Sequence, residues 1–178
     1  QKRFHIHDIA LPKQDFQLIA ACNPCPCGFY GDPDHACTCT QRQVMKYQNR
    51  IGGPLIDRID LHIDVQRVPP SDVISSTGGT SSAELKAGVL AGREYASWRR
   101  ARDERGSTTQ DLIASCHLND EDERFLEAMA QANHMSGRSI VRTVSVARTI
   151  ADIANRMRVT NDDLCEALGF RLREGVGA

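Results

Sequence analysis

The residues that first suggest chemistry are cysteines gathered in one short stretch of the chain. Five of the seven cysteines lie in the sequence ACNPCPCGFYGDPDHACTCT, from Ala21 to Thr40. Four of them form two close pairs separated by nine residues: Cys25, Cys27, Cys37 and Cys39. The glycine, aspartate and proline between the pairs would let the loop fold back, so that four thiolates converge as Zn²⁺ prefers. A closed shell of four sulfur ligands leaves no open position, and the sequence therefore predicts a structural zinc site.

Other interpretations of these cysteines stay open. The usual zinc knuckle has two residues between paired cysteines rather than one, and His35 could replace one thiolate. The cluster could also be a reduced loop that holds no ligand, whereas a disulfide within C-x-C would close a small and strained ring. Cys22 is expected inside a strand as a small core residue, and Cys116 and Cys165 are expected to be packing residues.

Two polar residues beside predicted strands are the other candidates for chemistry. Asn23 follows an apolar run, at the kind of strand end where open α/β sheets place their ligands. The alternative is that Asn23 is a turn former that only ends the strand. Arg58 precedes a second strand, and its simplest interpretation is a surface arginine. Taken by themselves, these residues favour the structural interpretations.

The elements around these candidates predict an α/β unit. Residues 16–22 (FQLIAAC) are a short apolar run, typical of a strand buried on both faces of a parallel sheet. In residues 59–65 (IDLHIDV), aliphatic residues alternate with polar ones, which is the period of a strand with one buried face. Between the two runs, Thr40 and Gln43 have the spacing of a capping box at the start of a helix that ends near Gly52.

The remainder of the chain is expected to be a linker followed by helices. Residues 67–82 are rich in Pro, Ser, Gly and Thr, which predicts a flexible linker or an exposed loop. Beyond it, apolar periodicity predicts helices over 83–105, 120–133, 136–155 and 162–170, the last of them opened by a capping box of Thr160 and Asp163. The chain then divides into an α/β unit over 1–66 that carries the cysteine loop, the linker over 67–82, and a small helical domain over 83–178.

The charges of the helical part have a structural interpretation. Arg148 and Asp152 are four residues apart and are expected to pair on one helix. Arginines crowd the second half of the helix over 83–105, but acidic residues lie among them, so a solvated helix end accounts for these charges.

Composition narrows the class of protein. The 22 basic and 23 acidic residues nearly cancel, so binding to a polyanion would require a local patch. No apolar run approaches the roughly 20 residues that span a bilayer. The amino terminus has no signal-peptide pattern, and we therefore expect a cytoplasmic protein without a membrane partner. The chain begins at Gln1 rather than Met, which suggests a piece of a longer protein.

Five motifs carry a family resemblance. They are FQLIAACNPCPCGFYG, CTCT, YQNRIGGPLIDRIDLHIDV, SGRSIVRTVSVARTIADIA and VTNDDLCEAL. They resemble those of the magnesium-chelatase-like AAA+ ATPases of the ComM/YifB type. The match is close over 16–68 and 120–173 and weak over the rest. It implies an α/β remnant of an AAA+ ATPase core followed by a small all-α lid domain.

The resemblance also implies roles for four residues. Asn23 would be the sensor 1 residue that orients the attacking water, and Arg58 the arginine finger that acts on ATP bound by a neighbouring subunit. Arg138 would be sensor 2 in the lid, with Arg142, one turn later on the same face, as the alternative. These roles make chemical sense. Phosphoryl transfer to water from ATP with its bound Mg²⁺ needs an oriented water molecule and positive charge at the γ-phosphate.

Two motifs of the family do not occur in this sequence. It contains no G-x-x-x-x-G-K-[ST], and no apolar run that ends in adjacent acidic residues. Both normally precede the sensor 1 strand. We therefore expect the chain to be the carboxyl-terminal part of a longer protein and to be unable to hydrolyse ATP on its own.

The function implied by the resemblance is that of an ATP-driven ring acting on DNA. The ring would be a homo-oligomer, expected to be a hexamer, and its activity would be branch migration during natural transformation. Two alternatives stay open. One is an ATP-driven metal chelatase subunit, although the sequence offers no porphyrin site. The other is a zinc-bearing nucleic-acid-binding module without an ATPase role, which would contact phosphates through the helix over 83–105.

Overall fold

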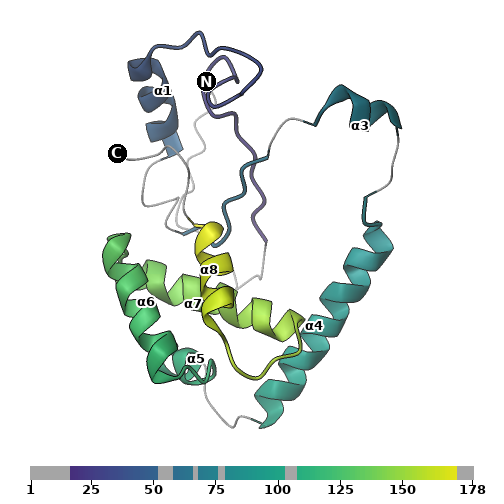
Figure 1. Ribbon diagram of the computed structural model, residues 1–178, viewed down its shortest axis with the longest axis vertical. Coiled ribbons are helices and arrows are strands. Elements are labelled where there is room, and N and C mark those ends of the chain that lie inside the picture. The colour runs from purple at the N-terminus through teal and green to yellow at the C-terminus, as the bar shows by residue number, and fades with distance from the viewer. Residues whose placement is uncertain (1–16, 52–57, 66–67, 76–78, 103–107, 172–178) are drawn as a thin grey trace, which may run out of the picture.

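The computed structural model describes residues 17–51, 58–65, 68–75, 79–102 and 108–171 (Figure 1). All regular structure in these ranges is helical. The elements are α1 (Gln41–Gln48), the 3₁₀ helix η1 (Asn49–Ile51), α3 (Pro70–Ser75), α4 (Ser82–Arg102), α5 (Thr109–Ala114), α6 (Asp120–Ala132), α7 (Gly137–Ile153) and α8 (Asn161–Gly169). None of the described helices is both long enough and apolar enough to cross a membrane.

The predicted α/β remnant is wrong for the part of the chain that the structure describes. Residues 17–22 and 59–65 run without a strand ladder, and no sheet forms in the described ranges. A strand is stabilised by hydrogen bonds to a neighbouring strand and by burial of a face, and these segments have neither. Ile19 is 84% exposed, Ile63 68% and Val65 88%. The alternating pattern of a strand was present in the sequence, but a pattern does not supply a partner.

The other cysteines also depart in part from their predicted environments. Cys22 was expected in a strand core and is exposed, in keeping with the missing sheet. Cys165 is exposed as well, so its predicted packing role is wrong. Cys116 is fully buried in the helical core, as predicted.

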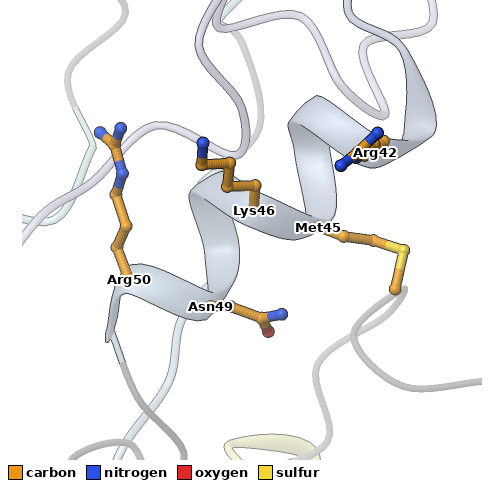
Figure 2. A pocket seen from close by; sticks show the side chains of 5 residues that line it. All are labelled: Arg42, Met45, Lys46, Asn49 and Arg50. Carbon is orange, nitrogen blue, oxygen red and sulfur yellow. The ribbon is translucent and has the colours of Figure 1, made fainter.

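Helix α1, which follows the cysteine loop, begins where the sequence predicted. Thr40 and Gln43 form the capping box, with the Gln43 amide oxygen accepting the Thr40 backbone N–H at 2.8 Å. Val44 is the buried residue of this helix. On the exposed side, five residues of α1 and η1 line a surface pocket: Arg42, Met45, Lys46, Asn49 and Arg50 (Figure 2).

Part of the predicted linker is helical. The short helix α3 lies inside the segment 67–82, and all of its residues are exposed. The six residues of α3 bury nothing, so the described residues of this segment contribute no core.

Helices α4 to α8 form the helical part of the molecule, which the sequence predicted. In Figure 1, α7 runs through its middle, and the contacts join α7 to α4, α5 and α8, and α6 to α8. The apolar positions of α7 recur every three or four residues, which gives it one continuous buried face. The core consists of Cys116, Val144, Ala147, Ala151, Val159, Leu164 and Ala167. Only the short α5 was not expected.

The long helix α4 packs against α7 through small residues. Gly92 and Ala96 are buried on α4, and a Cβ atom at Gly92 would lie 3.0 Å from Cγ1 of Ile153 and 3.3 Å from its Cα. The two helices therefore approach each other so closely at this point that a methyl group would require them to move.

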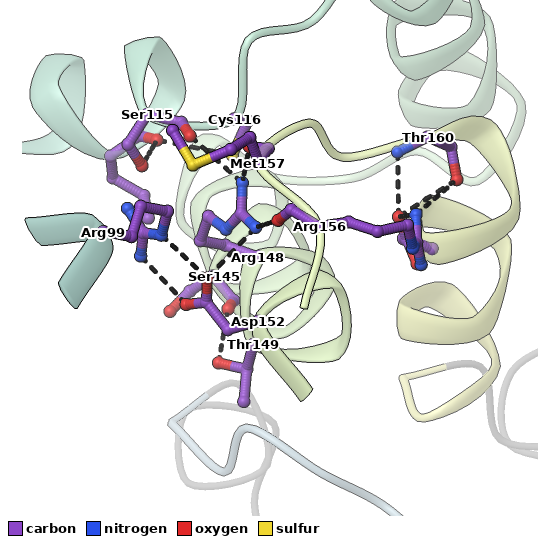
Figure 3. Close-up of polar contacts among 12 residues, drawn as sticks. Arg99, Ser115, Cys116, Ser145, Arg148, Thr149, Asp152, Arg156, Met157 and Thr160 are labelled. Atoms are coloured by element: carbon purple, nitrogen blue, oxygen red, sulfur yellow. Dashed lines mark hydrogen bonds and ion pairs between the residues drawn. The ribbon is translucent and has the colours of Figure 1, made fainter. Parts of the chain in front are cut away.

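A buried charge network joins α4, α7, the end of α5 and the loop that follows α7 (Figure 3). The Asp152 carboxylate accepts hydrogen bonds from Nε and Nη2 of Arg99, at 2.7 and 2.9 Å. Its Oδ1 also lies 3.1 Å from Nη2 of Arg148, which confirms the predicted pair of Arg148 and Asp152. Arg148 in turn donates to the backbone carbonyls of Ser115, Arg156 and Met157. One carboxylate thus holds two guanidinium groups and, through them, three segments of the fold.

Candidate functional site

The four paired cysteines come together in space. The Sγ atoms of Cys25, Cys27, Cys37 and Cys39 all lie within 4.8 Å of one another. Three of the separations are 3.3 Å between Cys25 and Cys27, 3.5 Å between Cys27 and Cys37, and 3.7 Å between Cys25 and Cys37. Four sulfurs held about 2.3 Å from a tetrahedral ion would lie about 3.8 Å from one another. The cluster therefore has the size and the donor set to bind a metal ion.

Turns in the loop explain how the pairs converge. Gly28 has a φ of +86°, and its N–H donates to the carbonyl of Cys25 at 3.1 Å. A residue with a side chain would be strained in this left-handed conformation, which glycine adopts freely. Farther along, the Asp32 carboxylate accepts the backbone N–H groups of Asp34 and His35 at 2.8 and 3.1 Å. The two turns fold the nine residues between the pairs back on themselves.

The thiols of the cluster differ in acidity. A hydrogen bond with the backbone of Phe29 makes the largest contribution to lowering the pKa of Cys27 to about 5. A backbone hydrogen bond at Cys39 favours the thiolate of Cys37, but desolvation and the neighbouring sulfurs outweigh it and raise the pKa of Cys37 to about 12. Desolvation also raises the pKa of Cys39. Sulfurs this close cannot all ionise without a cation among them, and a bound metal would supply that charge.

His35 is not part of the converging group. Its ring stacks on that of Phe29, with centroids 5.1 Å apart and planes 17° from parallel, and its Nδ1 lies 3.9 Å from the Asp32 carboxylate. Among the described residues, the ligand atoms that meet here are the four thiols. The geometry therefore favours four cysteine ligands over a set that includes His35.

Asn23 lies exposed at the start of the cysteine loop. Its neighbour Pro24 accepts a hydrogen bond on its carbonyl from Nε2 of Gln48, at 3.1 Å. Gln48 is the last residue of α1, so the far end of this helix is attached to the chain beside Asn23.

Arg58 is exposed, and the residues that follow it contact the helical part of the molecule. Asp60 forms an ion pair with Arg142 of α7. The carbonyl of Ile59 accepts a hydrogen bond from Nη1 of Arg171 at 3.3 Å. The backbone N–H of His62 donates to the carbonyl of Phe170, at the end of α8, at 2.7 Å. The segment after Arg58 is thereby fixed to both α7 and α8.

The two lid arginines have different surroundings. Arg138 is exposed in the first turn of α7, whereas the guanidinium of Arg142 is engaged by Asp60. Among the described residues, no hydrogen bond or ion pair joins Asn23, Arg58 and Arg138 to one another. The partnership of Asp60 and Arg142, 82 residues apart, had no signal in the sequence.

Two family models match this chain, one in each half. Residues 7–73 match the model described as magnesium chelatase, subunit ChlI, and residues 79–171 match the model of the ChlI carboxyl-terminal region. The chain belongs to the magnesium-chelatase-like family. The family resemblance of its five motifs is thus confirmed.

Three similar proteins come from different organisms. Competence protein ComM of Haemophilus influenzae is 38% identical over 158 residues, which cover 88% of this chain and 30% of ComM. The uncharacterized protein YifB of Escherichia coli is 37% identical over 88% of this chain and 31% of its own length. The uncharacterized protein Rv2897c of Mycobacterium tuberculosis is 29% identical over 160 residues. This magnesium-chelatase-like chain therefore spans about three-tenths of the length of the relatives it matches.

Proposed function

We propose that the chain is the carboxyl-terminal part of an AAA+ ATPase that couples ATP hydrolysis to the remodelling of DNA. The observation that carries the proposal is the match of both halves to magnesium chelatase models, together with 38% identity to a competence protein. The whole protein would bind ATP and Mg²⁺, assemble into a homo-oligomeric ring, expected to be a hexamer, and act in the cytoplasm. Branch migration during natural transformation is the activity that the ComM-type resemblance implies.

In this proposal, Asn23 is sensor 1, Arg58 is the arginine finger and Arg138 is sensor 2. An exposed amide at Asn23 can orient a water molecule, and exposed guanidinium groups at Arg58 and Arg138 can reach phosphates. The ion pair of Arg142 with Asp60 supports Arg138 over Arg142, because a guanidinium that is already engaged is less available to a nucleotide.

The contacts of the segment that follows Arg58 suggest how hydrolysis would be coupled to movement. Asp60 is attached to Arg142 of α7, and Ile59 and His62 are attached to the two residues that follow α8. A shift of Arg58 upon hydrolysis at a neighbouring subunit would therefore be transmitted to the helical part of the same chain.

The test of this function uses the whole ATPase. Arg58→Ala should lower the rate of ATP hydrolysis by about 10³-fold or more, because the finger supplies positive charge to the transition state. Arg93→Ala, which removes an exposed arginine on α4, is the matched control and should hydrolyse ATP normally. Wild-type turnover by Arg58→Ala would refute the assignment.

A mixing experiment tests whether Arg58 acts on the neighbouring subunit. Arg58→Ala subunits should regain hydrolysis when they are mixed with subunits whose P-loop is inactivated, since the latter still donate Arg58. No recovery in mixed rings would contradict a finger that acts between subunits. The present chain, whose sequence contains no P-loop motif, should not hydrolyse ATP by itself.

We also propose that the four cysteines hold a structural Zn²⁺ ion. The convergence of four sulfurs supports it, and the closed all-sulfur set suits Zn²⁺ in a structural rather than a catalytic role. Elemental analysis of the purified chain should find one zinc per molecule, and Cys25→Ser with Cys37→Ser should abolish it. Cys22→Ser, at an exposed cysteine outside the cluster, should keep the metal. If the purified chain contains no metal and is fully folded, the proposal of a structural zinc site is refuted.

A further inference from the structure

Helix α1 and the 3₁₀ turn after it carry a basic stripe, defined here as Arg42, Lys46 and Arg50. The three residues recur every four positions, so they lie on one side of the helix, and all three are exposed (Figure 2). The spacing corresponds to steps of about 6 Å along the axis and about 12 Å over the whole stripe. Asn49 lies beside the stripe and is also exposed.

The stripe lies in a part of the sequence that contains no acidic residue. The sequence has 23 acidic residues, yet none lies between His35 and Ile56. In the ranges that the structure describes, no carboxylate pairs with Arg42 or Lys46, and Arg50 lies 5.9 Å from the centre of the Tyr47 ring. A chain whose net charge is only −1 thus concentrates three cations on one side of a short helix.

The other arginine-rich helix of the molecule differs in this respect. On α4, Arg99 is buried against Asp152, and Arg102 lies 4.8 Å from the centre of the Trp98 ring. The basic end of α4 is therefore partly used to hold the fold together, which does not favour the predicted phosphate contacts of this helix.

We propose that the basic stripe binds the phosphate backbone of DNA. The inference rests on the proposed function, DNA remodelling, and assigns the contact to a particular surface. Two guanidinium groups and one ammonium group can each neutralise a phosphate, and the Asn49 amide can donate a further hydrogen bond. Such contacts do not read bases, so the binding is independent of sequence.

The stripe is less suited to a membrane surface. A helix that lies on lipid carries a broad face of large apolar residues opposite its cations. In α1, Met45 is the exposed large hydrophobic residue, whereas Val44 is buried. DNA is therefore the polyanion that the helix fits.

The location of the stripe connects DNA to the proposed nucleotide sensor. Helix α1 begins two residues after Cys39, at Gln41, and its last residue, Gln48, is hydrogen-bonded to Pro24 beside Asn23. DNA that binds to α1 would therefore restrain the segment that carries Asn23.

The experiment measures binding of fluorescein-labelled DNA by fluorescence anisotropy, with single-stranded and duplex oligonucleotides of arbitrary sequence. The variant combines Arg42→Gln, Lys46→Gln and Arg50→Gln, since glutamine keeps the helix propensity and removes the charge. Losing three phosphate contacts should reduce the slope of log K against log salt by about 2 to 3. Over a fourfold rise in salt, the affinity of the wild-type chain should fall about 20- to 40-fold more than that of the variant.

The matched control replaces two arginines and one lysine elsewhere. Lys86→Gln, Arg93→Gln and Arg100→Gln on α4 make the same change of charge at exposed positions, and they should leave the salt slope unchanged. A single Lys46→Glu variant provides a second test. It should weaken DNA binding more than Lys86→Glu does.

Several results would overturn the inference. One is a stripe variant that keeps the wild-type slope, and another is a control variant that loses as much as the stripe variant. Binding to vesicles that contain phosphatidylserine, without binding to DNA, would assign the stripe to lipid instead. If the wild-type chain binds DNA through other residues, the stripe is not the DNA-binding surface, but the proposed function still stands. Loss of hydrolysis by the Arg58→Ala ring is a separate readout, on which the ATPase proposal depends.

Discussion

Asp152 is the carboxylate that two buried arginines of the helical part share. It is 4% exposed and lies between Arg99, which is 4% exposed, and Arg148, which is 3% exposed. Burial alone lowers the pKa of Arg148, and the carboxylate of Asp152 acts in the opposite direction by favouring the charged guanidinium. Without that carboxylate, two buried guanidinium groups would lose the counter-ion that they share.

We therefore expect Asp152→Asn to be strongly destabilising. The free energy of unfolding should fall by about 3–5 kcal/mol, the usual cost when one partner of a buried pair is removed. Chemical denaturation measures it. Glu127→Gln, at an exposed position of α6, serves as the control and should change stability by less than about 0.5 kcal/mol. A similar loss for both variants would show that the network contributes little.

Cys116 should make the stability of the helical part fall at alkaline pH. Burial raises the pKa of its thiol from 9.0 to about 11. Between these values the unfolded chain loses a proton that the folded chain retains, so the free energy of unfolding should fall as pH rises, by roughly 3 kcal/mol in total. Denaturation of the wild type and of Cys116→Ala at a series of pH values tests this. The decline should be smaller in Cys116→Ala, and an equal decline would refute the assignment to this thiol.

At the scale of residues, the sequence predicted contacts between residues close together in the chain and missed contacts between residues far apart. Arg148 and Asp152 are one helical turn apart, so their spacing was sufficient to predict the pair. Arg99 joins the same carboxylate from 53 residues away, which no local pattern encodes. The four cysteines could be predicted because they lie within fifteen residues of one another.

At the scale of elements, two glycines of α4 should respond in opposite ways to the same substitution. A Cβ atom at Gly88 would meet nothing within 4 Å, so Gly88→Ala should stabilise the helix by about 0.5–1 kcal/mol. Gly92→Ala gains the same propensity but brings its methyl group against Ile153, and overpacking of this kind costs about 1–3 kcal/mol. Thermal denaturation of both variants should show a rise for the first and a fall for the second. Equal shifts would mean that α4 and α7 can separate without cost.

The success of sequence prediction also differed between kinds of element. Helices satisfy their own backbone hydrogen bonds, and caps such as Thr40 and Thr160 signal their ends within four residues. A strand instead requires a neighbour, and in the described ranges the segments 17–22 and 59–65 have none that forms a ladder with them. Period-two alternation could therefore be recognised correctly and still not predict a sheet.

At the scale of the whole molecule, the described chain has two separate groups of buried residues. Cys25 and Val44 belong to the cysteine loop and α1, while the buried hydrophobic residues from Ala96 onward belong to the helical part. In the described ranges, the contacts from the segment 58–65 to the helical part include one exposed ion pair, one backbone hydrogen bond and one hydrogen bond from the Arg171 side chain, each contributing about 1 kcal/mol. From these contacts we expect the two parts to differ in stability and to unfold separately.

Removal of the metal should therefore unfold one part and spare the other. In the zinc-loaded chain, a chelator should abolish the protection of α1 amides from hydrogen exchange, while the amides of α7 keep theirs. Mass spectrometry of peptides from the two helices provides the measurement. The variant with Cys25→Ser and Cys37→Ser should behave in the same way without a chelator. Parallel loss of protection in α1 and α7 would contradict the independence of the two parts.

The short span of the cysteine cluster also bears on the order of events during synthesis. All four thiols emerge from the ribosome within fifteen residues, and closing so short a loop has a small entropic cost. The helical part must wait longer, because Arg99 meets Asp152 only after 53 further residues have been made. We expect the metal loop to be complete before α7 exists. The supply of zinc to the nascent chain, rather than to the finished protein, would then decide whether the segment beside Asn23 acquires its shape.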